Sequence, residues 1–204
     1  ASCLVGSEMC IRDRYEDAFE DARNNNNSLI DPRWRIEHSQ NITPQDQQRF
    51  VDLKIIPSMQ ASHAIGDLHF AVDRLGLERI KNAYVWRSLI DQGLIIAGGT
   101  DAPVEIGDPR IEFYAAVTRM DVDGYHGEGW NLDQKITRFE ALKMFTIWPA
   151  IASFQEDVKG TIEVGKLADF SIFDSDLMLA PENQILNSKN ILTIVGGRIV
   201  FQAL

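Results

Sequence analysis

Three apolar, strand-like runs each lead to a residue that can bind a metal ion. The first run ends at Glu37 and is followed by His38, the run beginning at Ile55 leads to His63, and the run beginning at Leu94 leads to Asp101. In α/β barrels, reactive side chains project from the carboxyl ends of parallel strands, where the βα loops open to substrate. Two imidazoles and a carboxylate suit zinc or a similar divalent ion. The pattern therefore predicts parallel strands that bring three ligands to one ion.

Helical signals alternate with these runs. Thr43-Pro44 predicts a helix start, because threonine caps a helix and proline fits its first turn. Thr137 and Glu140 have the spacing of a capping box. The helices predicted along the chain cover residues 15–23, 43–53, 68–75, 88–92, 111–120 and 141–146, and a weaker strand is predicted at 83–86.

The predicted secondary structure changes in the C-terminal part of the chain. Strands are predicted at 160–164, 170–173, 190–195 and 198–201, the last two joined as a hairpin through Gly196-Gly197. Residues 28–150 supply about four strand–helix units, whereas a closed barrel needs eight. We therefore expect part of a barrel over 28–152, further β structure over 153–204, and a chain that is the back half of something larger.

Residues 1–27 are predicted to form a leader outside this organisation. The opening contains CLVGSEMCIRDR, which resembles a string seen ahead of unrelated reading frames from environmental sequencing. This favours a sequence artefact, and a loosely ordered native terminus is the alternative. The asparagines at 24–27 suggest a boundary near residue 27.

Charge and cysteine content exclude several classes of function. The net charge of −10 argues against nucleic acids and anionic membranes as partners, since both need basic patches. No apolar run is long enough to span a bilayer. Cys3 and Cys10 are the only cysteines, so the body has neither a disulfide framework nor a thiolate metal site. We expect a cytoplasmic protein with a small-molecule substrate, and homo-oligomer formation is left open.

Several short motifs together resemble one enzyme family. They are RIEH at 35–38, MQASH at 59–63 with Asp67, YVWRSLIDQG at 84–93, GTDAPVE at 99–105, AVTR at 116–119 and GTIEVGKLAD at 160–169. In this order and spacing they resemble the amidohydrolase superfamily, specifically amidohydrolase family 3, which includes N-substituted formamide deformylase-like enzymes.

The resemblance implies an α/β fold: the C-terminal half of a TIM-like (β/α)8 barrel, followed by strands of a small β-sandwich. It implies one or two divalent metal ions, with zinc expected. His38 resembles the metal ligand after the fifth strand and His63 the ligand after the sixth. Asp101 resembles the carboxylate after the eighth strand, which binds metal and transfers a proton. The family also has a His-x-His pair after its first strand, and this sequence contains no such pair.

Other polar residues have competing interpretations. His69 is an alternative to His63 as a ligand, although it lies in a predicted helix. Asp67 either accepts a hydrogen bond from a ligand imidazole or caps a helix. Arg87 either binds substrate or forms a surface ion pair. His126 either lines the mouth of a pocket or belongs to a solvated loop.

The predicted function is hydrolysis of an amide-type, non-peptide C–N bond by a metal-activated water, with Asp101 as the proton acceptor. Deamination and ester or lactone hydrolysis are alternatives, because fold does not select among these reactions. A non-catalytic fragment that lacks the His-x-His ligands is the third hypothesis.

Overall fold

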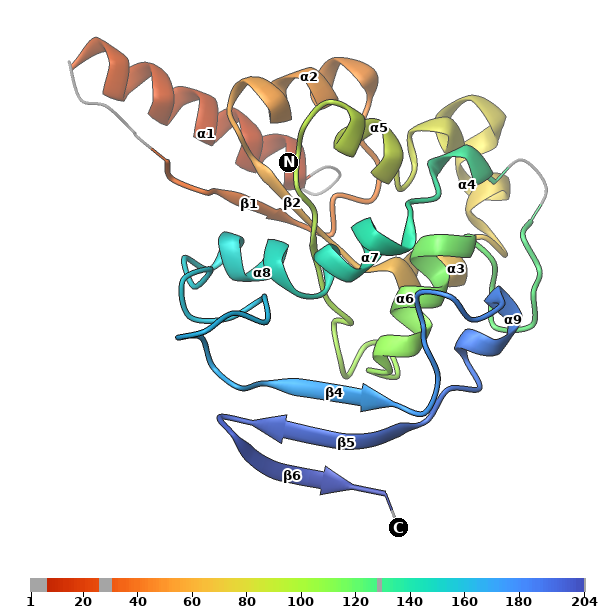
Figure 1. Cartoon of the computed structure of the whole chain (residues 1–204). Coiled ribbons are helices and arrows are strands. Elements are labelled where there is room, and N and C mark those ends of the chain that lie inside the picture. Colours follow the sequence, from red (N-terminus) through yellow and green to blue (C-terminus); the bar gives the residue numbers. More distant parts are fainter. Residues whose placement is uncertain (1–6, 26–30, 128–129, 204) are drawn as a thin grey trace.

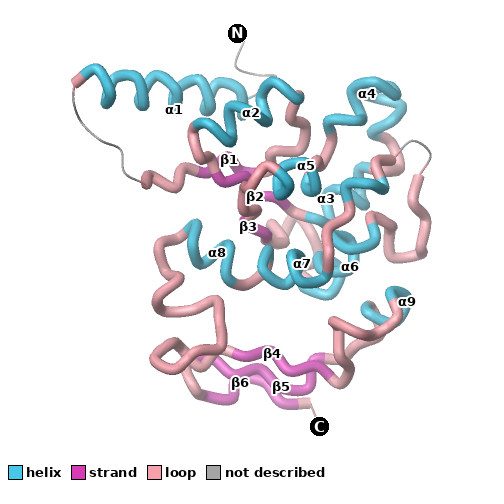
Figure 2. The backbone as a smooth tube through the Cα atoms, turned by 45° about the horizontal axis from the view of Figure 1, so that its top comes forward, coloured by secondary structure: helices cyan, strands magenta, loops and turns pink. Residues whose placement is uncertain are grey.

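The computed structural model describes residues 7–25, 31–127 and 130–203 of the chain. Helices surround a small parallel sheet, and a separate antiparallel sheet lies at the C-terminal end (Figure 1). The two sheets are distinct in Figure 2, where strands are magenta. No described helix is long and apolar enough to cross a membrane. The predicted mixed α/β fold is confirmed.

The parallel sheet has the strand order β1-β2-β3, with β1 at Arg35–Glu37, β2 at Ile56–Met59 and β3 at Ala97–Gly98. Because all three strands point the same way, their carboxyl ends share one edge. The sheet is open, so closure into a barrel stays a prediction.

The strand predicted at 83–86 is wrong. Ala83 forms only an isolated antiparallel bridge with Asn41, and Trp86 already belongs to a helix. The extended run is broken at Tyr84, whose φ of 51° lies in the left-handed region. Residues 83–86 are buried, and they form a turn followed by the start of a helix.

Most predicted helices are present. The helices are α1 (Ser7–Asn24), α2 (Pro44–Asp52), α3 (Ala61–Asp67), α4 (Ala71–Arg79), α5 (Trp86–Asp91), α6 (Pro109–Thr118), α7 (Arg138–Met144), α8 (Ile147–Ala152) and α9 (Glu182–Ile185), with 3-10 turns at Ile80–Asn82 and Leu132–Gln134. Thr43 caps α2, and Thr137 with Glu140 forms the predicted capping box of α7. The helix predicted over 68–75 is present from Ala71 onward, because residues 68–70 form the turn between α3 and α4. Gly76, the predicted end, has φ 73° and interrupts the helix, which resumes as far as Arg79.

Helix α1 lies against the beginning of the parallel sheet. The Tyr15 and Trp34 rings stack with centroids 4.5 Å apart, and the Tyr15 hydroxyl donates to the Arg35 carbonyl at 3.0 Å. Arg12 forms an ion pair with Asp46 in α2. The boundary predicted near residue 27 and the opening residues 1–6 lie outside the described residues.

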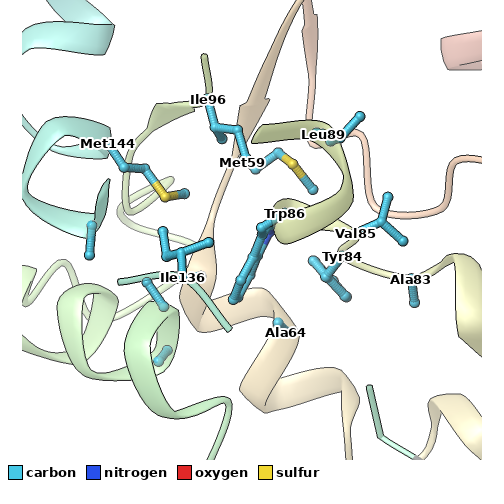
Figure 3. Close-up of a cluster of buried hydrophobic side chains, with 14 of the residues drawn as sticks. Met59, Ala64, Ala83, Tyr84, Val85, Trp86, Leu89, Ile96, Ile136 and Met144 are labelled. Atoms are coloured by element: carbon cyan, nitrogen blue, oxygen red, sulfur yellow. The ribbon is translucent and has the colours of Figure 1, made fainter. Parts of the chain in front are cut away.

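The core is centred on Trp86, whose side chain is fully buried. Figure 3 shows its indole among aliphatic and sulfur side chains that come from the sheet and the surrounding helices, including Met59, Ile96 and Met144. Met59 is the last residue of β2 and Ile96 directly precedes β3, so this core packs against both strands.

The C-terminal sheet consists of β4 (Phe170–Phe173), β5 (Asn190–Val195) and β6 (Arg198–Gln202), all antiparallel. The predicted hairpin is confirmed, with positive φ at Gly196 and Gly197 as a tight turn requires. The strand predicted at 160–164 is wrong, because this segment forms turns. Gly160 has φ 99°, and a Cβ there would lie 2.9 Å from Ile147 Cα, which fixes a turn rather than a strand. The sandwich stays a prediction.

Candidate metal centre

The structure brings the three predicted ligands together at the shared edge of the parallel sheet. His38 follows the last residue of β1, His63 lies in the first turn of α3 after β2, and Asp101 lies three residues beyond β3. One potential ligand atom from each lies within 4.8 Å of the others. Residues that are far apart in the sequence therefore meet because parallel strands end side by side.

The backbone at this edge is held in unusual conformations. His38 has φ 67° and Asp101 has φ 54°, both in the left-handed region that non-glycine residues rarely adopt. Such conformations cost free energy and persist only where the surrounding structure enforces them. Here they turn the chain sharply after each strand, so that the side chains face one another.

Gly98 lets β3 approach α7 closely. A Cβ at this position would lie 2.7 Å from the Met144 side chain and 2.8 Å from the Met144 carbonyl oxygen. Glycine is therefore required at the end of β3, and the close packing fixes the start of the loop that carries Asp101. Gly99 has open space where a Cβ would project.

His38 is oriented by a neighbour from the next strand. Its Nδ1–H donates to the Oε1 atom of Gln60 at 3.0 Å, and Gln60 directly follows β2. Because a carbonyl oxygen only accepts, this contact assigns the proton to Nδ1 and leaves the lone pair on Nε2. Metal-binding histidines commonly have their second nitrogen held in this way.

His63 provides the test of whether a metal ion fits. Both ring nitrogens are buried and have no hydrogen-bond partner within the described residues. A buried polar atom without a partner costs about 1–3 kcal/mol, and an ion at Nε2 would remove that cost. Nε2 lies 3.7 Å from Oδ2 of Asp101 and 3.6 Å from Oε1 of Glu105. These separations are too long for hydrogen bonds.

The distances between the three candidate ligand atoms are close to those between the ligand atoms of a metal site. With bonds of about 2.1 Å, two ligands of a tetrahedral zinc ion lie about 3.4 Å apart. The three candidate atoms lie within 4.8 Å of one another, so the widest possible separation has to shorten by about 1.4 Å to reach this spacing. The donor set of two imidazoles and one carboxylate also suits zinc. The residues present therefore fit a divalent ion.

A buried carboxylate from α6 fixes the helix that carries His63. Glu112 is only 1% exposed and accepts a hydrogen bond from the Ser62 backbone N–H at 3.0 Å. The N-cap of α3, Gln60, makes no capping hydrogen bond with its side chain. Burial raises the pKa of Glu112, and hydrogen bonds from Ser62 and Ala61 oppose that rise. Glu112, which lies in α6, thus accepts a hydrogen bond from a backbone N–H at the start of α3 that has no partner within its own helix.

Three other predicted site residues contact neither ligand imidazole. Asp67 ends α3 and accepts a hydrogen bond from the Tyr84 hydroxyl at 2.6 Å, whereas the imidazole of His38 uses Gln60. His69 pairs with Asp121 at 3.0 Å and stacks on Tyr125. His126 has its Nδ1 beside the Gly127 carbonyl at 3.1 Å. Among the described residues, the cluster contains His63 and not His69.

Arg87, which was predicted to bind substrate or to form an ion pair, has its guanidinium occupied by carboxylates. It makes two hydrogen bonds to Glu140, at 2.7 and 2.9 Å, and one to Asp91 at 2.8 Å. Glu140 is also the capping-box residue of α7. Arg87 therefore joins α5 to the start of α7.

We expect Glu140→Gln to destabilise the fold by about 2 kcal/mol at pH 7, since it weakens a charge-assisted pair and a helix cap. The Arg87 guanidinium lowers the pKa of Glu140 to about 2. A depressed carboxyl pKa gives stability that is present above pH 4.5 and is lost as the pH falls towards 2. The variant should lose less stability than the wild type across that interval. Denaturant unfolding at several pH values measures both effects.

Asp91→Asn is the matched control, because Asp91 contacts the same guanidinium from an exposed position. Exposed pairs contribute little, so its effect should stay below about 0.5 kcal/mol. Equal losses in the two variants would contradict the role given to Glu140.

Gln60, Glu105 and Glu112 were not predicted as site residues from the sequence. Two of them had a recognisable signal. Gln60 follows a strand just as His38 does, and Glu112 is an acidic residue on the otherwise buried face of α6. Glu105 became significant only when the structure placed it 3.6 Å from His63.

Curated proteins of two organisms are similar in sequence to this chain. The YtcJ protein of Bacillus subtilis (strain 168) is 30% identical over 168 residues, which are 82% of this chain and 32% of that protein. The N-substituted formamide deformylase of Arthrobacter pascens is 28% identical over 201 residues, 98% of this chain and 36% of the enzyme. The chain thus spans about a third of the length of the curated relatives that it matches.

Among solved structures, an uncharacterized metal-dependent hydrolase from Pyrococcus horikoshii OT3 is similar with a TM-score of 0.66 and 29% identity. The similarity covers 81% of this chain and 32% of that protein. The model of the amidohydrolase family matches residues 9–201, a range that includes most of α1, which the sequence analysis placed in a leader outside the family. Because this match extends over nearly the whole sequence, the chain belongs to the amidohydrolase family.

Proposed function

We propose that this chain contributes His38, His63 and Asp101 to the metal centre of a hydrolase that cleaves an amide-type C–N bond. The observation that carries the proposal is the convergence of the three side chains, with both nitrogens of His63 buried and unpartnered among the described residues. Membership of the amidohydrolase family, and similarity to a formamide deformylase, support C–N bond hydrolysis.

The two histidines and Asp101 have different roles in this proposal. Nε2 of His38, with its proton placed on Nδ1 by Gln60, and His63 would hold a divalent ion, for which zinc is the expected identity. When bound, such an ion acidifies a water molecule and polarises a carbonyl group. Asp101, whose side chain is 37% exposed, is accessible to water and substrate. It accepts the proton of the attacking water and passes it to the leaving nitrogen.

Asp101→Asn tests this assignment. An amide side chain keeps the shape of aspartate and can still bind a metal through oxygen, but it is not a base. We expect hydrolysis of N-benzylformamide, followed as benzylamine release, to fall by about 100-fold or more. Zinc content, measured by elemental analysis, should change far less.

The exposed Asp157→Asn is the control and should leave the rate unchanged. Wild-type rates in Asp101→Asn would remove Asp101 from the mechanism. A wild-type chain that binds zinc but does not hydrolyse the formamide would limit the proposal to metal binding.

A further inference from the structure

A pocket of about 290 Å³ adjoins the candidate metal centre: Glu105 lines the pocket, and its Oε1 atom lies 3.6 Å from Nε2 of His63. Five carboxylate residues line it: Glu105, Asp108, Glu112, Asp121 and Asp123. Within the described part of the chain, no lysine or arginine is among the lining residues. Clustered carboxylates repel one another, so this pocket favours a positive charge.

Two of these carboxylates have no cation to neutralise them. Asp108 is paired with Arg110, Asp121 with His69, and Glu112 accepts backbone hydrogen bonds at the start of α3. The one basic side chain recorded within 4 Å of Glu105 among the described residues is the imidazole of His63, at 3.6 Å. Asp123 forms no ion pair with any described residue. The negative charge of the pocket is therefore incompletely balanced by the chain itself.

The pocket also contains a buried hydroxyl, without a partner among the described residues, that can accept a hydrogen bond from an ammonium group. Ser62 is 5% exposed and lines the pocket; its hydroxyl lies near Glu112 but makes no hydrogen bond of normal geometry within the described residues. A buried hydroxyl is ordinarily satisfied, so an unpaired one that lines a cavity points to a missing ligand or water. Ile65, Ile111 and Val122 add apolar surface beside the carboxylates. The lining thus combines negative charge with hydrophobic contact.

We propose that this pocket binds a protonated amine attached to an apolar group, and that Glu105 is the residue that selects the positive charge. The inference rests on the proposed function in one respect: a substrate whose scissile bond lies at the metal centre would place its ammonium group in this adjoining pocket. The substrate class would then be amides that carry a second, cationic amine. Glu105, between His63 and the pocket, faces both parts of such a substrate.

Binding of benzylammonium to the metal-free 204-residue chain tests this proposal without any need for turnover. Benzyl alcohol and benzoate serve as the neutral and anionic analogues of similar shape. We expect benzylammonium to bind at least tenfold more tightly than either, measured by calorimetry or by NMR chemical shifts of the pocket residues. Its affinity should weaken as salt is raised, because the attraction is electrostatic.

Glu105→Gln should weaken benzylammonium binding by about tenfold, the effect of losing a charge-assisted contact. Glu78→Gln removes the same charge from an exposed position on α4, outside the pocket, and should leave the affinity unchanged. Equal binding of the three analogues, or equal affinity in Glu105→Gln, overturns the proposal.

The outcomes separate this inference from the proposed function. If zinc binds stoichiometrically but the pocket shows no preference for benzylammonium, the metal centre stands and the cation pocket is rejected. If benzylammonium binds selectively but zinc does not bind, the cation pocket stands and the hydrolase proposal loses its foundation.

Discussion

Replacing His63 by Ala is expected to weaken zinc binding by about 10³-fold or more, the largest effect of any single change in this chain. The His63 side chain is only 11% exposed, compared with 37% for Asp101. Its removal leaves one imidazole and one carboxylate, which is too few for the three protein ligands of a catalytic zinc site. Calorimetric titration of the metal-free protein with zinc measures the loss.

The same substitution should not destabilise the metal-free fold. Because both ring nitrogens are buried without a partner among the described residues, the wild-type side chain carries a cost that alanine lacks. We therefore expect unchanged or higher thermal stability without zinc, and loss of the stabilisation that zinc gives the wild type. A merely structural histidine would behave in the opposite way.

His126→Ala and His69→Ala are the matched controls. Both histidines lie outside the three-residue cluster and have their own contacts, His69 with Asp121 and His126 with Gly127. Each variant should bind zinc as the wild type does. If His69→Ala lost zinc while His63→Ala kept it, the assignment of the ligand after β2 would be reversed.

The sequence predicted the position of the candidate site better than its surroundings. Alternating apolar runs and helix caps located β1, β2 and α2, and hence the edge where His38 and His63 meet. The information is local in each case, because a strand end and a capping threonine are recognisable within a few residues. Parallel pairing then brings these strand ends to one edge of the sheet, and the left-handed conformations of His38 and Asp101 complete the convergence.

The residues that orient the ligands were not predictable in the same way. Gln60 and Glu112 act across elements, so their partners are defined only when strands and helices pack. The same reason explains the failure at 83–86, where an apolar run was assigned to a strand. The left-handed conformation of Tyr84 depends on tertiary contacts, including its backbone N–H to the Gln40 carbonyl at 2.8 Å.

Tyr84 also connects the core to the candidate site. Its hydroxyl donates to Asp67 at the end of α3 and accepts from the Gln40 side chain, two residues after His38. Burial and the nearby Asp67 raise the pKa of this hydroxyl, which stays protonated and keeps donating at neutral pH. We therefore expect a change in the core next to Tyr84 to affect the candidate metal centre.

Trp86→Ala is the core change with the largest expected effect, a loss of about 4 kcal/mol in the free energy of unfolding. Trp86 is fully buried, and its ring lies against the Arg119 guanidinium, with Cζ 4.7 Å from the ring centroid. Arg119 is itself buried, and burial lowers its pKa to about 9. Removing the indole therefore creates a cavity and also takes away one of the two aromatic faces that stabilise a buried cation, the other being Trp130.

Trp86→Phe separates these contributions, because it retains an aromatic face while leaving a much smaller cavity. We expect it to lose about half as much stability as Trp86→Ala, as measured by urea denaturation. Zinc affinity should also fall by a few fold in Trp86→Ala. Arg119, which loses the indole, donates a hydrogen bond to the Tyr84 carbonyl at 2.8 Å. It therefore helps to hold Tyr84, whose hydroxyl contacts Asp67 and Gln40. A loss below 1 kcal/mol in Trp86→Ala would show that this core adapts freely, and that Tyr84 and the metal centre do not depend on its packing.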